Sequence, residues 1–312
     1  MPSRSRRDPR RVPTLRRVVR TRNAAMRDVL DTVAKVLDHD VSLLILGESG
    51  SGKDFLAQAI HACGTRRERP FVTIECASIP PELFESELFG YEKGTFTDAQ
   101  SRKLGKLESA GSGTVYFDEI AALTPPLQAK LLRAIQERAF TRLGGHEPIR
   151  FAGRVITSSN DDLSGLRRDL FYRINVVTIT LPPLRDRRED VALLATQFAK
   201  QASKTIAADA MKLLTAYTWP GNVRELRNVI ERAAILEDGE RITPASLPLD
   251  RIAGAPALVA SAKREKWTLD ELESHYIREV LRETKSNYSK AALVLGINRK
   301  TLLEKRRKYG IE

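Results

Sequence analysis

The seven residues from Gly47 to Lys53, GESGSGK, constrain the fold of this 312-residue chain more than any other stretch. An apolar run from Leu43 to Leu46 precedes them and reads as a buried strand, and apolar residues at helical spacing follow from Phe55 to Ile60. Glycines at a strand-to-helix turn let several backbone N–H groups point at one anion, and the helix N-terminus adds its dipole. Because Lys53 supplies a cation for the outer phosphates, the pattern predicts a phosphate-binding loop rather than a flexible glycine and serine turn.

We expect this loop to bind a nucleotide, although one position is unusual. Asp54 stands where most loops of this kind place a magnesium-binding Ser or Thr. The nucleotide-binding residues expected here are Gly47, Glu48, Ser49, Gly50, Ser51, Gly52, Lys53 and Asp54.

Two acids, Asp118 and Glu119, end an apolar run that begins at Val115. An acid pair at the carboxyl end of a buried strand, downstream of a phosphate-binding loop, suits ATP hydrolysis. Asp118 would hold Mg²⁺ through water, and Glu119 would polarise the attacking water. The alternative is a pair of solvated acids at a strand end. Asn160 ends another predicted strand, where it would sense the terminal phosphate or orient the water.

Arg167 and Arg173 flank the short segment 169–172. One interpretation is that both arginines form surface ion pairs, as most arginines do. In a ring of identical subunits, however, these two side chains could reach the neighbour's nucleotide and stabilise charge on the transferred phosphoryl group. We therefore include both among the expected catalytic residues.

Composition indicates a polyanion-binding protein without a membrane span. The net charge is +12, and residues 1–22 contain nine arginines against one acid, Asp8. We expect a disordered arm that contacts phosphates, with an organellar transit peptide as the alternative. No apolar run reaches membrane-spanning length, and two cysteines in a chain of this size fit a reducing cytoplasm.

The C-terminal segment carries a helix-turn-helix pattern. A short helical stretch over 288–295 is followed by Gly296 and a basic helical stretch over 298–307. A glycine turn between helices, with cations on the second, favours DNA binding over a merely solvated basic helix. The residues expected to contact DNA are Asn298, Arg299, Lys300, Thr301, Lys305 and Arg306.

Five motifs in order, GESGSGKD, ELFGYEKGTFTDA, GTVYFDEI, FYRIN and WPGNVREL, followed by the helix-turn-helix, resemble bacterial enhancer-binding proteins. These are the AAA+ activators that remodel sigma-54 RNA polymerase, and the resemblance covers residues 23–312. It implies ATP and Mg²⁺ as cofactors, Asn160 as a first sensor and Arg224 as a second sensor on a lid. Arg167 and Arg173 would be fingers that act between subunits.

The resemblance also implies a fold and a domain order. The fold would be α/β, a three-layer P-loop AAA+ domain with a helical lid subdomain, plus an all-α helix-turn-helix domain. The expected segments are a basic disordered arm over 1–22, the α/β nucleotide-binding subdomain over 23–184, the lid over 185–249, a linker over 250–266 and the DNA-binding domain over 267–312.

Phe96 and Thr97 resemble the pair that contacts sigma-54 in this family, but the surroundings differ. The family loop reads GAFTGA, whereas here Thr95 adds bulk and Asp98 adds a charge. Glu75 replaces an asparagine that restrains the catalytic glutamate, and the segment from Asn160 to Arg167 is shorter. The chain resembles the subgroup without an N-terminal regulatory domain, so regulation would come from a partner protein or from expression level.

We therefore expect an ATP-dependent activator that binds an upstream activating sequence and promotes open-complex formation by sigma-54 RNA polymerase. Self-association from dimer to hexameric ring would complete its active sites. The alternative is a DNA-binding regulator that keeps the AAA+ scaffold without remodelling sigma-54. An unfoldase or clamp-loader relative is disfavoured by the terminal DNA reader.

Overall fold

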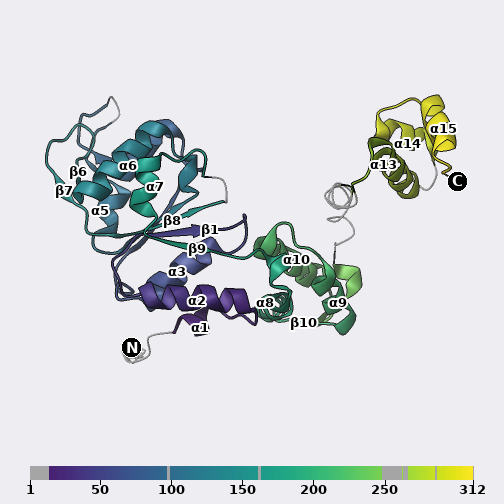
Figure 1. Ribbon diagram of the computed structural model, residues 1–312, viewed down its shortest axis with the longest axis horizontal. Helices are drawn as coiled ribbons and strands as arrows, with labels where there is room; N and C mark the ends of the chain where they lie inside the picture. The colour runs from purple at the N-terminus through teal and green to yellow at the C-terminus, as the bar shows by residue number, and fades with distance from the viewer. Residues whose placement is uncertain are drawn as a thin grey trace. The chain divides into compact units, whose positions relative to one another are not determined.

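The computed structural model describes residues 14–96, 99–160, 163–247, 262, 266–284 and 287–311. The chain divides into two compact units, Met1–Ser246 and Leu247–Glu312, which are described separately below. Figure 1 shows the elements of both.

A five-stranded parallel sheet, with strand order β2-β5-β8-β1-β9, forms the middle layer of the first unit (Figure 1). The strands are β1 (Leu43–Leu46), β2 (Phe71–Glu75), β5 (Thr114–Asp118), β8 (Arg154–Ser159) and β9 (Val177–Thr180). Glu75 is paired with Asp118, and Leu46 with Ser159. Since parallel strands end at one edge, the polar residues that follow β1, β2, β5 and β8 meet there.

Helices cover both faces of this sheet, as Figure 1 shows for α2 and α3 on one side and α6 and α7 on the other. The helices of the first face are α2 (Ala24–Val36) and α3 (Lys53–Cys63). Those of the second face are α4 (Pro81–Phe89), α5 (Lys106–Ala110), the 3-10 turn η1 (Ile120–Ala122), α6 (Pro125–Glu137) and α7 (Arg168–Ile174). The expected three-layer α/β architecture is therefore confirmed.

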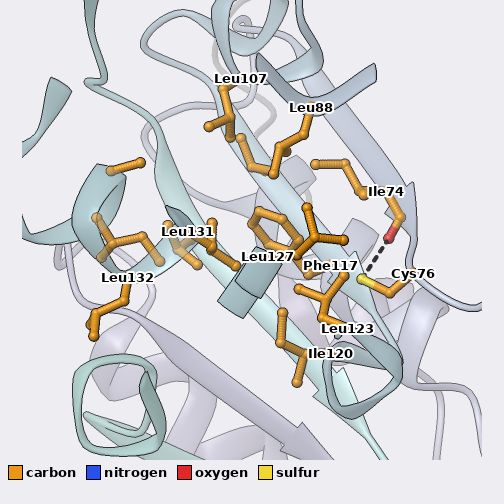
Figure 2. Close-up of a cluster of buried hydrophobic side chains, with 14 of the residues drawn as sticks. Ile74, Cys76, Leu88, Leu107, Phe117, Ile120, Leu123, Leu127, Leu131 and Leu132 are labelled. Atoms are coloured by element: carbon orange, nitrogen blue, oxygen red, sulfur yellow. Dashed lines mark hydrogen bonds between the residues drawn. The ribbon is translucent and has the colours of Figure 1, made fainter. Parts of the chain in front are cut away.

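Alternation along β5 builds a separate core on each face. Val115 and Phe117 join the α4–α7 side, and Tyr116 joins the α2–α3 side. Figure 2 shows the first of these cores, with Phe117 among leucines of α6 and with the Cys76 thiol directed at the Ile74 carbonyl oxygen, 3.8 Å away. Pro125 begins α6, whose leucines then face the sheet at helical spacing.

Two hairpins project from the second face. They are β3–β4 (Gly90–Tyr91 with Lys103–Leu104) and β6–β7 (Ala139–Phe140 with Ile149–Arg150). The hairpins are joined because the Glu92 N–H donates to the Leu143 carbonyl oxygen at 3.0 Å. Arg142, which is buried, also binds both Glu92 and Glu108.

The segment 14–22 is folded, contrary to the expectation of a disordered arm over 1–22. Residues Leu15–Val18 form α1, and Leu15 and Val19 are buried in the core beside α2 and α3. The Thr21 hydroxyl donates to Asp190 at 2.6 Å. The segment folds because apolar residues recur among its arginines. These apolar residues pack on the core while the arginines face solvent. Residues 1–13 lie outside the described residues.

A helical lid completes the first unit. It contains η2 (Leu184–Asp186), α8 (Arg188–Gln201), β10 (Thr205–Ile206), α9 (Ala208–Ala216), α10 (Asn222–Leu236), β11 (Arg241–Ile242) and η3 (Pro244–Ser246). Trp219 anchors it: the ring is fully buried and its Nε1–H donates to the Leu214 carbonyl oxygen at 2.8 Å. Most of the expected linker over 250–266 lies outside the described residues.

In the described part of the second unit, three helices pack together: α13 (Leu269–Glu283), α14 (Tyr288–Leu295) and α15 (Arg299–Lys308). Thr268 and Glu271 form a capping box at the start of α13. Gly296, with φ of 65°, ends α14 in the left-handed conformation that a tight helix-to-helix turn needs. Ile277, Ala291 and Leu302, one from each helix, meet in the core.

Candidate active site

The loop from Gly47 to Lys53 lies at the carboxyl edge of the sheet, between β1 and α3. Gly47, Gly50 and Gly52 have φ angles of 149°, 75° and 102°, which residues with a Cβ rarely adopt. A Cβ at Gly50 would in addition overlap the Gly221 carbonyl oxygen. The glycines therefore serve both the curvature of the loop and its contact with the lid.

Lys53 is buried and extends back across the loop. Its Nζ donates to the Gly47 carbonyl oxygen at 2.8 Å and to Asn160 Oδ1 at 3.1 Å, and it lies 3.2 Å from Glu119 Oε1. The structure thus brings together three of the predicted residues, from three different elements, around one ammonium group.

The two predicted acids are held by backbone and hydroxyl groups. Asp118 Oδ1 accepts hydrogen bonds from Ser158 Oγ at 2.6 Å and from Tyr116 Oη at 2.9 Å. Glu119 has φ of 54°, and its Oε2 accepts the Asn160 N–H at 3.1 Å. Burial is the main cause that raises the pKa of the Tyr116 phenol, so this hydroxyl stays protonated as a donor.

A polar cavity of about 490 Å³ surrounds these groups. Besides Lys53 and Glu119, it is lined by Asp54 and Asp118, and by Glu75 from β2. A dedicated metal cage of three or more His, Cys, Asp or Glu residues does not occur among the residues that the structure describes. Mg²⁺ in nucleotide sites commonly takes one or two carboxylates together with phosphates and water, and Asp54 and Asp118 fit that pattern of donors.

A second, less polar cavity of about 470 Å³ adjoins the first and shares Gly50, Gly52 and Arg224 with it. Val19 from the N-terminal segment and Phe198 from the lid are also part of its wall. The loop thus borders a charged cavity and a more apolar one.

Arg187, which sequence reasoning missed, is buried at this second cavity. Its Nη2 donates to the Ser51 carbonyl oxygen at 2.6 Å, and its Nε has no hydrogen-bond partner among the described residues. Burial is the main cause that lowers the pKa of the Arg187 guanidinium, and Asp190 opposes the shift. No local motif separates Arg187 from its neighbouring arginines in the sequence.

The start of α10 is docked directly on the loop. The N–H groups of Val223 and Arg224 donate to the Gly50 carbonyl oxygen at 2.9 and 3.3 Å, and Arg224 Nη1 donates to Ser49 Oγ at 2.9 Å. Arg224 therefore lies where the sequence predicts a lid residue that reaches the nucleotide loop.

Asn222 also contributes to this contact, although it was not predicted as a site residue. It is fully buried with φ of 55°; its Nδ2 donates to Glu48 Oε2 at 3.1 Å and to the Ser49 carbonyl oxygen at 3.0 Å. Its Oδ1 accepts the Leu184 N–H at 2.7 Å. Arg185 binds both oxygens of Glu48, and this hydrogen bonding is the main cause that lowers the pKa of the Glu48 carboxyl.

Arg167 and Arg173 are exposed and do not line either cavity. Arg167 pairs with Asp169 at 2.7 Å, and Arg173 Nη2 donates to the Ile135 carbonyl oxygen at 3.3 Å. Within one chain they are thus separate from the groups around Lys53, so their predicted catalytic role depends on a neighbouring subunit.

Phe96 lies in the loop of the β3–β4 hairpin with 45% of its surface exposed, and its ring packs edge-on against Tyr91. The Thr95 hydroxyl donates to the carbonyl oxygens of Glu92 and Leu143 at 2.6 and 3.0 Å. Two further members of the predicted sigma-54 loop, Thr97 and Asp98, lie outside the described residues.

The predicted DNA-contacting residues fall into two groups in the second unit. Arg299 and Lys300 are exposed in the first turn of α15, whereas Asn298 Oδ1 caps that helix by accepting the Thr301 N–H at 2.8 Å. Lys305 and Arg306 have partners inside the domain: Lys305 pairs with Glu273 at 2.7 Å, and Arg306 lies over the Tyr288 ring.

A buried lysine and strand-end acids around one cavity, reached by a helical lid, define the class of AAA+ ATPases, and the C-terminal unit adds a DNA-binding fold. Family comparisons agree with each part. Residues 19–180 match the model of the sigma-54 interaction domain, residues 185–264 that of the AAA+ ATPase lid domain, and residues 268–309 that of the bacterial regulatory proteins of the Fis family. The chain therefore belongs to the sigma-54-dependent transcription regulators with a Fis-type helix-turn-helix.

Similar proteins of this family come from several bacteria. The regulatory protein AtoC of Escherichia coli is 43% identical over 94% of this chain and 68% of its own length. ZraR of Salmonella typhimurium is 44% identical over 90% of this chain and 66% of its own length. NtrC of Rhizobium meliloti is 38% identical over 93% and 69%. The chain thus spans about two thirds of these relatives.

Solved structures resemble most of the chain. NtrX from Brucella abortus in complex with ATP has a TM-score of 0.67 and 34% identity, covering 94% of this chain and 69% of that one. The complex of NtrX with ADP has a TM-score of 0.69 and 33% identity.

In the part of the chain that the structure describes, no helix has the length and apolarity needed to cross a bilayer.

Proposed function

We propose that this protein hydrolyses ATP to remodel sigma-54 RNA polymerase after binding DNA upstream of the promoter. The observation that carries the proposal is that Glu119 and Asn160 both contact the buried Lys53 ammonium group, within the same unit that displays Phe96 on a hairpin. A transcription regulator of this kind acts in the bacterial cytoplasm, where promoter DNA is found.

Within the site, the chain's own residues account for binding and for activation of water. Phosphate oxygens would compete with Glu119 for the Lys53 ammonium group, so nucleotide binding would free the Glu119 carboxylate to polarise water. Asp118 and Asp54 would hold Mg²⁺, which when bound neutralises charge on the phosphates. The Asn160 N–H would keep its hydrogen bond to Glu119. A movement of Glu119 on phosphate binding would therefore shift Asn160 and the adjoining end of β8.

Assembly would supply the groups that one chain lacks near the cavity. Arg167 and Arg173 are exposed on one surface, and a ring of subunits could place them beside the neighbour's phosphates. We propose self-association up to a hexamer on this ground. A regulatory partner protein would act on the assembled ring.

The second unit would bind the upstream activating sequence through the first turn of α15. Arg299 and Lys300 are the exposed cations there, and a helix N-terminus favours phosphate contacts. Lys305 and Arg306 would contribute mainly by fixing α15 in place.

Open-complex formation on a sigma-54 promoter tests the proposal directly. Wild-type protein should open the promoter with ATP; Glu119→Gln should abolish turnover and opening, and Phe96→Ala should keep turnover while losing opening. Glu240→Gln, an exposed change in the lid, is the matched control and should behave as wild type. ATP turnover without any opening by the wild-type protein would contradict remodelling and favour a DNA-binding regulator on an AAA+ scaffold, to which Glu75 in the cavity wall also points.

A further inference from the structure

Two buried hydroxyl groups lie behind the acid that would hold the metal. Ser158 Oγ and Tyr116 Oη both donate to the same oxygen of Asp118, Oδ1, at 2.6 and 2.9 Å. Tyr116 is 1% exposed and Ser158 is fully buried. Asp118 Oδ2, in contrast, accepts no hydrogen bond from the residues that the structure describes. The two donors thus occupy one oxygen and leave the other available at the cavity.

Ser158 also holds the next acid in the chain. Its Oγ accepts the Glu119 N–H at 3.1 Å, which supports the left-handed backbone of Glu119 at φ of 54°. One hydroxyl on β8 therefore fixes the side chain of Asp118 and the backbone of Glu119. Asn160, the predicted phosphate sensor, follows directly after the end of the same strand.

The chemistry of these donors suits a metal-binding carboxylate. A lysine or arginine at either position would neutralise Asp118 and compete with a cation, whereas neutral hydroxyls orient the carboxylate and leave its charge intact. Outer partners of this kind commonly change metal affinity by about 10- to 100-fold when they are removed.

We propose that Tyr116 and Ser158 are positioning residues for the magnesium ion: their hydroxyl groups fix Asp118 so that Oδ2 faces the metal and its water. The inference rests on the proposed ATPase function, and it adds two buried residues that act on the metal through Asp118 rather than by binding it themselves. Replacing either hydroxyl should weaken metal binding while leaving the glycine-rich loop from Gly47 to Lys53 able to bind nucleotide without metal.

The experiment measures Mn²⁺ binding to the full-length protein with ADP, by electron paramagnetic resonance, for Tyr116→Phe and Ser158→Ala. We expect Tyr116→Phe to raise the Kd for Mn²⁺ about tenfold, and Ser158→Ala to raise it further, because it also releases Glu119. The affinity for ADP in EDTA should stay within about twofold of wild type, a result that general loss of packing would not give.

Two substitutions provide matched controls. Ser159→Ala removes the neighbouring buried hydroxyl, which has no hydrogen-bond partner among the described residues. Tyr217→Phe removes a tyrosine that donates to a carboxylate, Glu225, in the lid at 3.3 Å. Both should bind Mn²⁺ as wild type does.

Three results would overturn the proposal. The first is an unchanged Kd for Mn²⁺ in both Tyr116→Phe and Ser158→Ala. The second is a parallel loss of metal-free ADP affinity, which would assign the hydroxyls to packing alone. A wild-type protein that binds no nucleotide would overturn the proposed function together with this inference, so the two failures can be told apart.

Discussion

Asn222 combines an unfavourable backbone conformation with three hydrogen bonds to the loop and the start of the lid. A buried group that loses its hydrogen-bond partner lowers the free energy of unfolding by about 1 to 3 kcal/mol. A residue with a Cβ in the left-handed backbone conformation lowers it by about 1 to 2 kcal/mol. We therefore expect Asn222→Ala to lower the free energy of unfolding by about 2 to 4 kcal/mol. Asn222→Gly, which relieves the backbone strain, should cost about 1 kcal/mol less, as measured by urea unfolding. Equal costs for the two variants would contradict a role for the conformation.

Glu48 gives the lid contact a defined dependence on pH. The Arg185 guanidinium lowers the pKa of the Glu48 carboxyl below its ordinary value of 4.5, against an opposing effect of burial. A lowered pKa in the folded state means that the contribution to stability is present above pH 4.5 and is lost as the pH falls through the folded-state pKa. The difference in Tm between wild type and Glu48→Gln should therefore be constant near neutral pH. It should shrink below pH 4.5, as the pH falls through the folded-state pKa of Glu48.

The partner residue provides the control for this dependence. Arg185→Gln removes the same ion pair from the other side and should show the same pattern as Glu48→Gln. A difference in Tm that stays constant from pH 6 to 3.5 would show that the carboxylate charge does not stabilise the contact.

At the scale of single elements, α15 separates cations that contact solvent from cations that hold the domain together. Lys300 is exposed and makes no ion pair among the described residues, whereas Lys305 pairs with Glu273 on α13. Lys300→Ala should weaken DNA binding and reduce the slope of log affinity against log salt by about one, without changing the Tm of the second unit. Lys305→Ala should instead lower that Tm.

Lys212→Ala, an equal change of charge on the lid, controls for the net charge of the protein. It should leave the salt dependence of DNA binding unchanged when affinity is measured by fluorescence anisotropy. If Lys300→Ala and Lys212→Ala behave alike, the first turn of α15 does not contact DNA.

The order of elements follows closely from sequence patterns. The strand before Gly47, the strand ending in Asp118 and the helix after Pro125 were predicted because short apolar runs and helical spacing determine which face is buried. Segment 14–22 was misjudged because arginine density concealed the apolar stripe that includes Leu15 and Val19.

The site was predictable where residue type and chemistry coincide, as at Lys53 and Glu119. It was not predictable where function depends on a partner distant in the sequence. Tyr116 looks like any apolar strand residue until Ser158, 40 residues beyond Asp118, is placed beside the same carboxylate. Asn222 likewise gains its role from Glu48, 174 positions earlier.

At the scale of the whole molecule, the nucleotide cavities and the DNA-binding helices belong to different compact units. Calorimetry should therefore resolve two transitions, of which ATP analogues with Mg²⁺ raise only that of the larger unit. At a ligand concentration 100 times Kd the expected stabilisation is about 2.7 kcal/mol, or roughly 5 to 10 °C in Tm. Lys53→Ala should abolish this shift, and a shift of both transitions would contradict independence of the units.

The folded segment 14–22 has a practical consequence for anyone who handles this protein. Val18, Val19 and Arg20 form part of the wall of the less polar cavity, and Thr21 is attached to the lid through Asp190. An affinity tag, a fluorescent reporter or a surface tether fused to the N-terminal end would therefore be joined to a segment that lines this cavity. Labels intended to leave turnover undisturbed are therefore better attached at the C-terminal end. A pulling force applied at the N-terminal end would act on residues that line the cavity, and we expect it to change the rate of nucleotide release.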